Sequence, residues 1–222
     1  MNGIWILLIL ILTATLPAII GFIWFKSNKI PVSLPWYLIS LVAGAVSLFF
    51  AALIQSFFPP PVRSGLGPVF FGIFVRIALV EEASRLVTLV PLLKIGSRLR
   101  NDDIVFGSAL GLAAGLGFAA IENAFYGTAD INITLLRAFT AAPLHGACGI
   151  RTGTAVLSFR EHPVKAIFLF ISAVLIHGAY NLMIVSPALP SIPLIRAAIV
   201  ILFAIAVLYT SLSYIKTAEG SY

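Results

Sequence analysis

The distribution of apolar residues limits this chain to a membrane fold. A helix of about 20 mainly apolar residues crosses a hydrocarbon core, whereas a membrane strand is about half as long. The sequence contains seven runs that suit a helical crossing: Ile4–Phe25, Pro35–Phe58, Leu66–Leu93, Ile104–Tyr126, Ile131–Phe159, Val164–Ser186 and Pro190–Ile215. A helix satisfies its own backbone hydrogen bonds in lipid, so the sequence predicts an all-α bundle of about seven transmembrane helices.

Composition leaves no part of the chain for a soluble domain. Of its 222 residues, 60% are hydrophobic and only 10% are charged. We therefore expect one integral membrane domain over residues 1–222, with its functional core over residues 66–186. The net charge of +6 lies mostly in short loops between the runs. Such a pattern is typical of membrane topology and gives no reason to expect a nucleic-acid partner.

The loop charges also predict an orientation. Basic residues gather in alternate loops, and the loops between these contain Arg63 and little else. Because short basic loops stay in the cytoplasm, we expect the N-terminus outside and the C-terminus inside the cell membrane. The predicted cytoplasmic loops carry Lys26, Lys29, Lys94, Arg98, Arg100, Arg160, Lys165 and Lys216.

Several ionisable side chains lie inside the apolar runs. Each costs about 2.5–3.5 kcal/mol on membrane insertion, so isolated groups at this number would prevent the fold. They must therefore face one another, and such groups usually mark a functional site. The set consists of Arg76, Glu81, Glu82, Arg85, Glu122, Arg137, His145, Arg151 and His177.

The third run carries two adjacent carboxylates. Glu82 precedes Arg85 by three residues and Glu81 precedes it by four, which places both carboxylates within reach of the arginine on one helix face. A self-contained ion pair would only make the run insertable. However, two carboxylates exceed what one arginine needs, and a spare carboxylate is what general base catalysis requires.

The fourth run contains a ridge of small residues. Gly107, Gly111 and Gly115 follow at four-residue steps, a spacing that lets a neighbouring helix approach closely. Glu122 lies on roughly the same face as Gly115 and so points at another helix. It also lies toward the outer end of its run, about 10 Å from the midplane at 1.5 Å per residue. We therefore expect Glu122 at the entrance of the site.

The last two polar positions are histidines on separate runs. His145 lies in the middle of the fifth run and His177 in the middle of the sixth, where Asn181 shares its helix face. Alone, such residues are more typical of hydrogen bonds between packed helices. Together with a carboxylate they suggest hydrolysis: a glutamate with His145 deprotonates water, while His177 and Asn181 stabilise the oxyanion.

Four segments in this order resemble the PrsW family of membrane proteases: Glu81–Arg85, Gly117–Asn123, Pro143–His145 and His177–Asn181. That family is similar to the CAAX prenyl endopeptidases and the bacteriocin-processing membrane peptidases. The resemblance implies peptide hydrolysis within the membrane by a glutamate-type reaction. It also implies catalytic roles for the double glutamate, the FxxxE glutamate and both histidines with Asn181, which are Glu81, Glu82, Glu122, His145, His177 and Asn181.

Three positions depart from the family pattern. Ala141 stands where an aromatic residue usually precedes the histidine, and Asn181 stands where Asp is frequent. Arg85 is one residue closer to the glutamates than in the CAAX endopeptidases. The sequence therefore favours a PrsW-like substrate, a membrane-anchored protein such as an anti-sigma factor, over a prenylated protein.

The remaining alternatives concern chemistry and class. HExxH and GxSG motifs are missing from the sequence, and each aspartate lies in or beside a predicted loop. We expect no cofactor, while a zinc site made of Glu82, His145 and His177 stays open because three such ligands and water describe catalytic zinc. A proton- or ion-coupled transporter would use the same residues as a relay, and a scaffold would use them for packing.

Overall fold

The computed structural model describes residues 3–59, 65–100, 104–128, 131–185 and 193–219. These residues are helical throughout, apart from short connections, and contain no strand. The helices are α1 (Gly3–Ser27), α2 (Leu34–Ser56), α3 (Leu66–Phe70), the π-helical segment η1 (Phe71–Leu79), α4 (Val80–Arg100), α5 (Ile104–Gly127), α6 (Ile131–Phe139), α7 (Ala141–Ser158), α8 (Pro163–Val185) and α9 (Pro193–Glu219). The all-α prediction is confirmed for this part of the chain.

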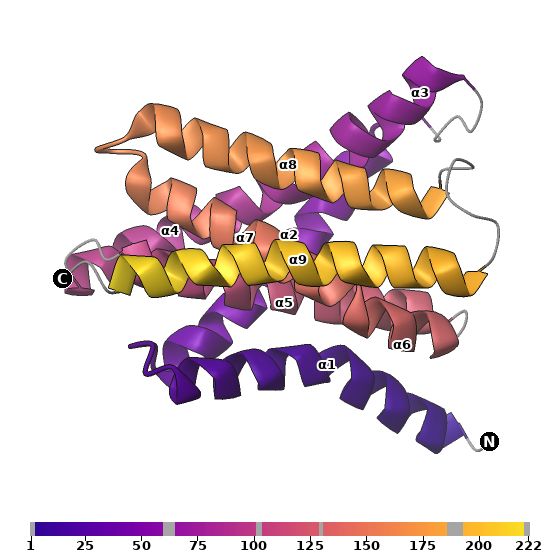
Figure 1. The fold of residues 1–222 in the computed structure, drawn as a ribbon, viewed down its shortest axis with the longest axis horizontal. Coiled ribbons are helices and arrows are strands. Elements are labelled where there is room, and N and C mark those ends of the chain that lie inside the picture. Colours follow the sequence, from indigo (N-terminus) through magenta and orange to yellow (C-terminus); the bar gives the residue numbers. More distant parts are fainter. Residues whose placement is uncertain (1–2, 60–64, 101–103, 129–130, 186–192, 220–222) are drawn as a thin grey trace.

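The centre of the bundle is α5, which is buried along most of its length. It packs against α7, α2 and α1, and Figure 1 shows α8 and α9 running alongside on the outside. Figure 1 shows that α1 is bent. The helix contains an internal proline, Pro17, which cannot donate a helical hydrogen bond and is a common cause of such bends. Prolines also begin α8 and α9, where a missing N–H costs nothing.

The glycine ridge of α5 contacts the backbone of α7, as its spacing predicted. A side chain at Gly111 would overlap the Gly149 carbonyl, and one at Gly115 would overlap the carbonyl of His145. Gly153 on α7 lies equally close to the backbone of Gly107. The two helices therefore meet backbone to backbone, and this contact fixes the position of His145 relative to α5.

Five helices in the described ranges are long and apolar enough to cross a membrane: α1, α2, α5, α8 and α9. The third predicted run forms a continuous helical path from α3 through η1 to α4, and the fifth is divided into α6 and α7 at Thr140. The protein is thus a multi-pass membrane protein, while the count of seven crossings stays a prediction. The helix α4 continues to Arg100, beyond the end of the third predicted run at Leu93.

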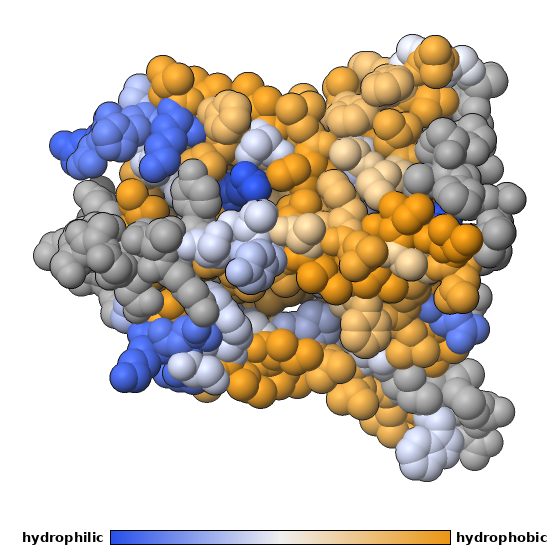
Figure 2. Space-filling model, in the orientation of Figure 1, coloured by the Kyte–Doolittle hydropathy of each residue, from blue (hydrophilic) through white to orange (hydrophobic). Residues whose placement is uncertain are grey.

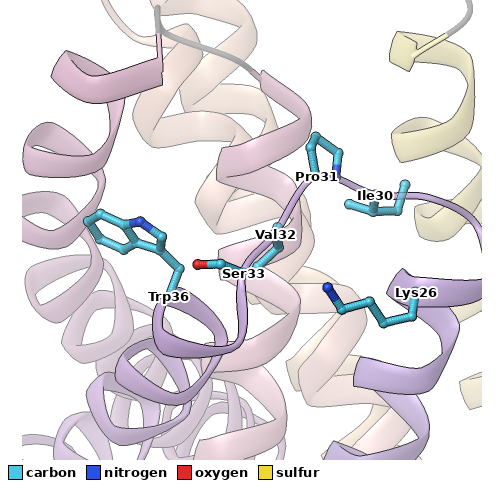
Figure 3. Close-up of a pocket in the computed structure, with 6 residues that line it drawn as sticks. All are labelled: Lys26, Ile30, Pro31, Val32, Ser33 and Trp36. Atoms are coloured by element: carbon cyan, nitrogen blue, oxygen red, sulfur yellow. The ribbon is translucent and has the colours of Figure 1, made fainter.

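Apolar side chains cover most of the face seen in Figure 2, whereas hydrophilic ones gather toward the end where α1 finishes and α8 begins. A pocket at this end is lined by residues of the α1–α2 connection, and Figure 3 shows Lys26 and Trp36 beside it. The connections expected to be cytoplasmic after α1 and after α7 thus lie at the same end (Figure 1).

Candidate active site

The polar residues of four helices meet in one buried cluster. Glu81 and Glu82 lie in the first turn of α4, Glu122 near the end of α5, His145 in the second turn of α7, and His177 on α8. All five are buried or, for Glu122, mostly buried. The predicted convergence of these groups is therefore observed.

Glu82 is completely enclosed by protein groups. Its Oε2 accepts hydrogen bonds from Arg85 and, at 3.3 Å, from the Thr152 hydroxyl. Its Oε1 lies 2.9 Å from Nδ1 of His177. Because Glu82 is fully buried and paired with a guanidinium, we treat it as ionised, so Nδ1 of His177 is the donor. The Arg85–Glu82–His177 triad therefore fixes the orientation of the imidazole.

Glu81 has a different environment from its neighbour. Its Oε1 accepts a hydrogen bond from Nε2 of Gln55 at 3.1 Å, and its Oε2 lies 3.5 Å from Nε2 of His177. This buried Oε2 has no hydrogen-bond partner among the described residues. The expectation that Arg85 binds both carboxylates was wrong, since it pairs with Glu82 while Gln55, from α2, takes Glu81.

His145 lies next to His177, with the rings in a T-shaped arrangement 4.8 Å apart. Nη2 of Arg85 lies 3.2 Å from its Nδ1, and Oε2 of Glu122 lies 2.9 Å from its Nε2. A guanidinium only donates hydrogen bonds, so Nδ1 accepts and Nε2–H donates to Glu122. His145 is therefore held in a single tautomer between an arginine and a glutamate.

Glu122 belongs to the cluster itself and also forms its exposed edge. Besides His145, its Oε2 accepts a hydrogen bond of 2.5 Å from Nη2 of Arg137 on α6. The Glu122 side chain is 17% exposed and that of Arg137 is 11% exposed. The depth offset expected from the sequence took the fifth run as one helix centred on His145. Because that run breaks at Thr140, His145 lies near the start of α7, beside the end of α5.

Other polar residues differ in how far they take part. Asn181 lies one turn after His177, is half-buried, and forms no hydrogen bond with the cluster residues that the structure describes. Gln55, Thr152 and Arg137 do contact the cluster but had no assigned role in the sequence analysis. Arg137 had one signal, its charge inside an apolar run, whereas Gln55 and Thr152 had none.

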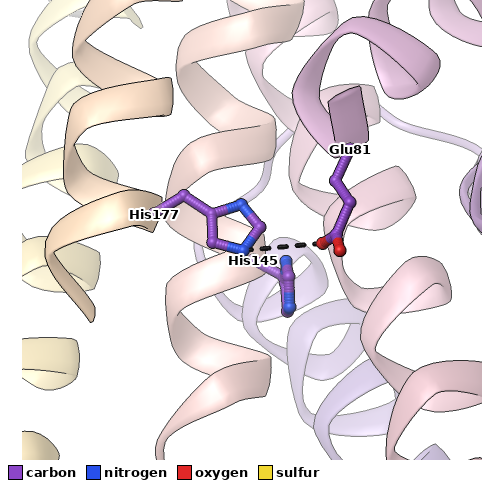
Figure 4. A group of neighbouring side chains, drawn as sticks. All are labelled: Glu81, His145 and His177. Carbon is purple, nitrogen blue, oxygen red and sulfur yellow. Dashed lines mark ion pairs between the residues drawn. The ribbon is translucent and has the colours of Figure 1, made fainter. Parts of the chain in front are cut away.

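Glu81, His145 and His177 form a group with the donor types of a metal site. One ligand atom from each lies within 4.8 Å of the others, and Figure 4 shows the three side chains converging. The dashed line in Figure 4 joins Nε2 of His177 to Oε2 of Glu81, which lie 3.5 Å apart. With Nδ1–H bound to Glu82, Nε2 of a neutral His177 carries a lone pair that faces this unpaired oxygen. Two such acceptors fit a cation between them.

This arrangement fits catalytic zinc, which takes three protein ligands and leaves one position open. The carboxylate bound to the far nitrogen of His177 is a frequent feature of metal-binding histidines. In the structure the glutamate close to both histidines as a possible metal ligand is Glu81. The zinc site considered from the sequence used Glu82 instead. Binding through His145 requires exchange of one of its two present contacts.

The fold and the site define a polytopic membrane protein with an enclosed glutamate–histidine centre of hydrolytic type. Residues 32–210 match the model of the PrsW family, described as intramembrane metalloproteases. The chain therefore belongs to the PrsW family of membrane proteases. Searches of curated proteins and of solved structures found no match. The family description names a metalloprotease, whereas the sequence favoured a reaction without a cofactor.

Proposed function

We propose that the protein is an intramembrane endopeptidase that cleaves a membrane-anchored protein at a metal held by Glu81, His145 and His177. The observation that carries this proposal is the buried Oε2 of Glu81, which lacks a donor and faces Nε2 of His177. A buried carboxylate oxygen without a partner is costly unless a cation or proton completes it. When bound, the metal supplies Lewis acid chemistry and an activated water.

The double glutamate then has two separate tasks. Glu81 belongs to the ligand set, while Glu82 orients His177 through Nδ1 and is itself fixed by Arg85. Both carboxylate oxygens of Glu82 already accept hydrogen bonds, and the residue is fully buried. Glu82 therefore has no free oxygen to receive a proton from water, which argues against Glu82 as the base among the two glutamates, Glu81 and Glu82, that the sequence left open for this role.

We assign proton transfer from the attacking water to Glu122. Its Oε2 is held by His145 and Arg137, whereas its Oε1 forms no hydrogen bond within the described ranges. Glu122 is also the most exposed of the three glutamates in the cluster. A general base needs a free oxygen within reach of water, and among these carboxylates Glu122 meets that requirement best.

Asn181 keeps its proposed role as a donor to the oxyanion. Its carboxamide is half-buried one turn from His177 and is not committed to the cluster. His177, in contrast, has Nδ1 bound to Glu82 and Nε2 facing Glu81. The oxyanion role proposed for both residues is therefore better supported for Asn181 alone.

We infer the substrate class from the location of the site, with support from the family. A buried cluster inside a membrane bundle receives peptide that is itself held at the membrane, and an anti-sigma factor is one such protein. No observation on this chain favours a prenylated substrate or ion transport. The test below therefore includes a prenyl-dependent cleavage and an ion flux among its possible outcomes.

Comparative membrane proteomics tests the proposal. Strains carrying wild-type protein, Glu122→Gln, His177→Ala or the control His162→Ala are compared for a membrane protein that accumulates uncleaved. The third histidine, His162, is exposed after α7 and lies outside the cluster, so it is a matched control. We expect one precursor to accumulate in both cluster variants and not in the control. Purified wild type should then cleave this precursor at least about 100-fold faster than Glu122→Gln.

Two results would refute the proposal. One is identical membrane proteomes for wild type, Glu122→Gln and His177→Ala, all expressed to equal levels. The other is proton or ion flux in proteoliposomes that the two cluster variants abolish, without any proteolysis. Cleavage that requires a prenyl group on the precursor would keep the reaction and change the substrate class.

A further inference from the structure

A second arginine–glutamate–histidine triad crosses the site from α6. Arg137 donates to Oε2 of Glu122, and the same oxygen accepts from Nε2–H of His145. The first triad, Arg85–Glu82–His177, has the same order of groups. Each histidine of the cluster thus has one nitrogen on a carboxylate that an arginine holds.

Arg137 is fixed by more than its ion pair. Its Nε donates to Oδ1 of Asn123 at 2.8 Å, and its guanidinium lies 4.1 Å from the centre of the Tyr126 ring. The short helix that carries it is tied to the same part of α5, because the Thr134 hydroxyl donates to the Asn123 carbonyl at 2.9 Å. The contacts with Glu122, Asn123 and Tyr126 fix the planar guanidinium of Arg137, which in turn gives Glu122 a defined orientation.

We propose that Arg137 is a positioning residue, which holds Glu122 with Oε2 on His145 and Oε1 free for water. Arg137 lies outside the segments that resemble the family motifs. The inference rests on the proposed role of Glu122, but the geometry it concerns exists without metal or substrate. Without Arg137, the carboxylate loses the guanidinium that the described residues place on it and is free to rotate. The Nε2–H of His145 then loses its acceptor, while Arg85 still keeps Nδ1 unprotonated.

The Nε2–H signal of His145 is a direct readout of this contact. The chain has three histidines, so the imidazole ¹⁵N and ¹H signals of histidine-labelled, metal-free protein are assignable with His162→Ala and His177→Ala. In wild type we expect the His145 proton on Nε2, with the downfield ¹H shift and slow exchange with water of a hydrogen-bonded N–H. In Arg137→Gln we expect this proton upfield and in faster exchange, with Nδ1 still unprotonated because Arg85 donates to it. Arg151→Gln is the control, since this half-buried arginine on α7 bonds Ser172 and not Glu122.

The same variants are compared for turnover of the precursor found by proteomics. We expect Arg137→Gln to lower kcat by about 10- to 100-fold with KM little changed, as for other residues that orient a first ligand or base. Arg137→Lys keeps a charge for Glu122 but loses the fork to Asn123, so it should recover part of kcat. Arg151→Gln should retain wild-type kcat.

The proposal is overturned if folded Arg137→Gln keeps the wild-type shift and exchange rate of the His145 Nε2–H and a wild-type kcat. If Arg137→Gln does not fold, Asn123→Ala and Arg137→Lys decide, and a wild-type Nε2–H signal and kcat in both overturn it. Because the Nε2–H measurement needs no substrate, a wild type that cleaves nothing refutes the proposed function while Arg137 is still judged.

Discussion

At the scale of single residues, Arg85 links a glutamate and a histidine of the buried cluster. It is fully buried, pairs with Glu82, reaches Nδ1 of His145, and lies 4.8 Å from the centre of the Phe118 ring. A buried ion pair contributes little net stability, but removing one partner leaves the other charge uncompensated. Substitution of Arg85 should therefore destabilise the protein more than substitution of an arginine on the surface.

This argument predicts the effect of removing one partner or both. Arg85→Met should lower the free energy of unfolding by about 3–5 kcal/mol, because Glu82 is left as an unpaired buried charge. The double variant Arg85→Met with Glu82→Gln should recover most of that loss. Unfolding in mixed micelles measures both, and Arg160→Met, on the exposed turn after α7, is the control. Equal stability of Arg85→Met and wild type would show that Glu82 is not held as an ion.

The sequence predicted which polar groups lie together but not which of them pair. Charged groups inside apolar runs indicate which residues must meet, because burying them separately is too costly. Helical spacing allowed Arg85 to reach Glu81 or Glu82 equally, and only the tertiary contact of Gln55 with Glu81 separates the two. The metal ligand assignment therefore changed from Glu82 to Glu81.

At the scale of helices, the α5–α7 contact determines where the side chains of the site lie relative to one another. Gly111 and Gly115 let the backbone of α7 approach α5, which sets His145 beside the end of α5 where Glu122 lies. A ridge of small residues is readable from sequence because its four-residue period is that of a helix face. Which helix it contacts is not readable, since several runs have suitable faces.

A larger residue in this ridge should therefore separate the two helices. Gly111→Ala places a methyl group against the Gly149 carbonyl, and we expect a loss of about 1–3 kcal/mol in the free energy of unfolding. Gly67→Ala is the matched control, because a side chain there meets nothing within 4 Å. Thermal unfolding in detergent compares the two. A Gly111→Ala protein as stable as Gly67→Ala would contradict the close backbone contact.

Helix interruptions were the least predictable feature of the fold. The fifth run reads as one apolar stretch, but Thr140 adopts φ −119° and ψ −65° and divides α6 from α7. Pro143, in the first turn of α7, suits a helix start, where its missing N–H has no intrahelical acceptor. This break moves His145 from the expected middle of a span to the beginning of a helix.

At the scale of the whole molecule, orientation in the membrane is still a prediction. The connection after α5 and the connection after α7 should lie on opposite sides of the membrane, because the run that contains α6 and α7 is expected to cross it. The basic residues Arg160 and Lys165 place the connection after α7 in the cytoplasm. The chain has a single cysteine, Cys148, which is buried. Cys148→Ala therefore gives a background for single-cysteine labelling.

On that background, Thr128→Cys should react with a membrane-impermeant maleimide in intact cells, since we place the end of α5 outside. Glu161→Cys should react only after the cells are permeabilised. Both positions are exposed, so labelling reports the side of the membrane and not burial. The reverse pattern would invert the predicted topology and place the site toward the cytoplasm.

The central claim is that Glu81, His145 and His177 hold a metal inside the membrane bundle. The most direct measurement is zinc bound by purified protein after chelation and re-addition, for wild type, Glu81→Gln, His177→Ala and the control His162→Ala. We expect one equivalent in wild type and in the control, and an affinity at least about tenfold weaker in the two ligand variants. Wild-type zinc binding by Glu81→Gln and His177→Ala, or full proteolysis by metal-free wild type, would contradict the account.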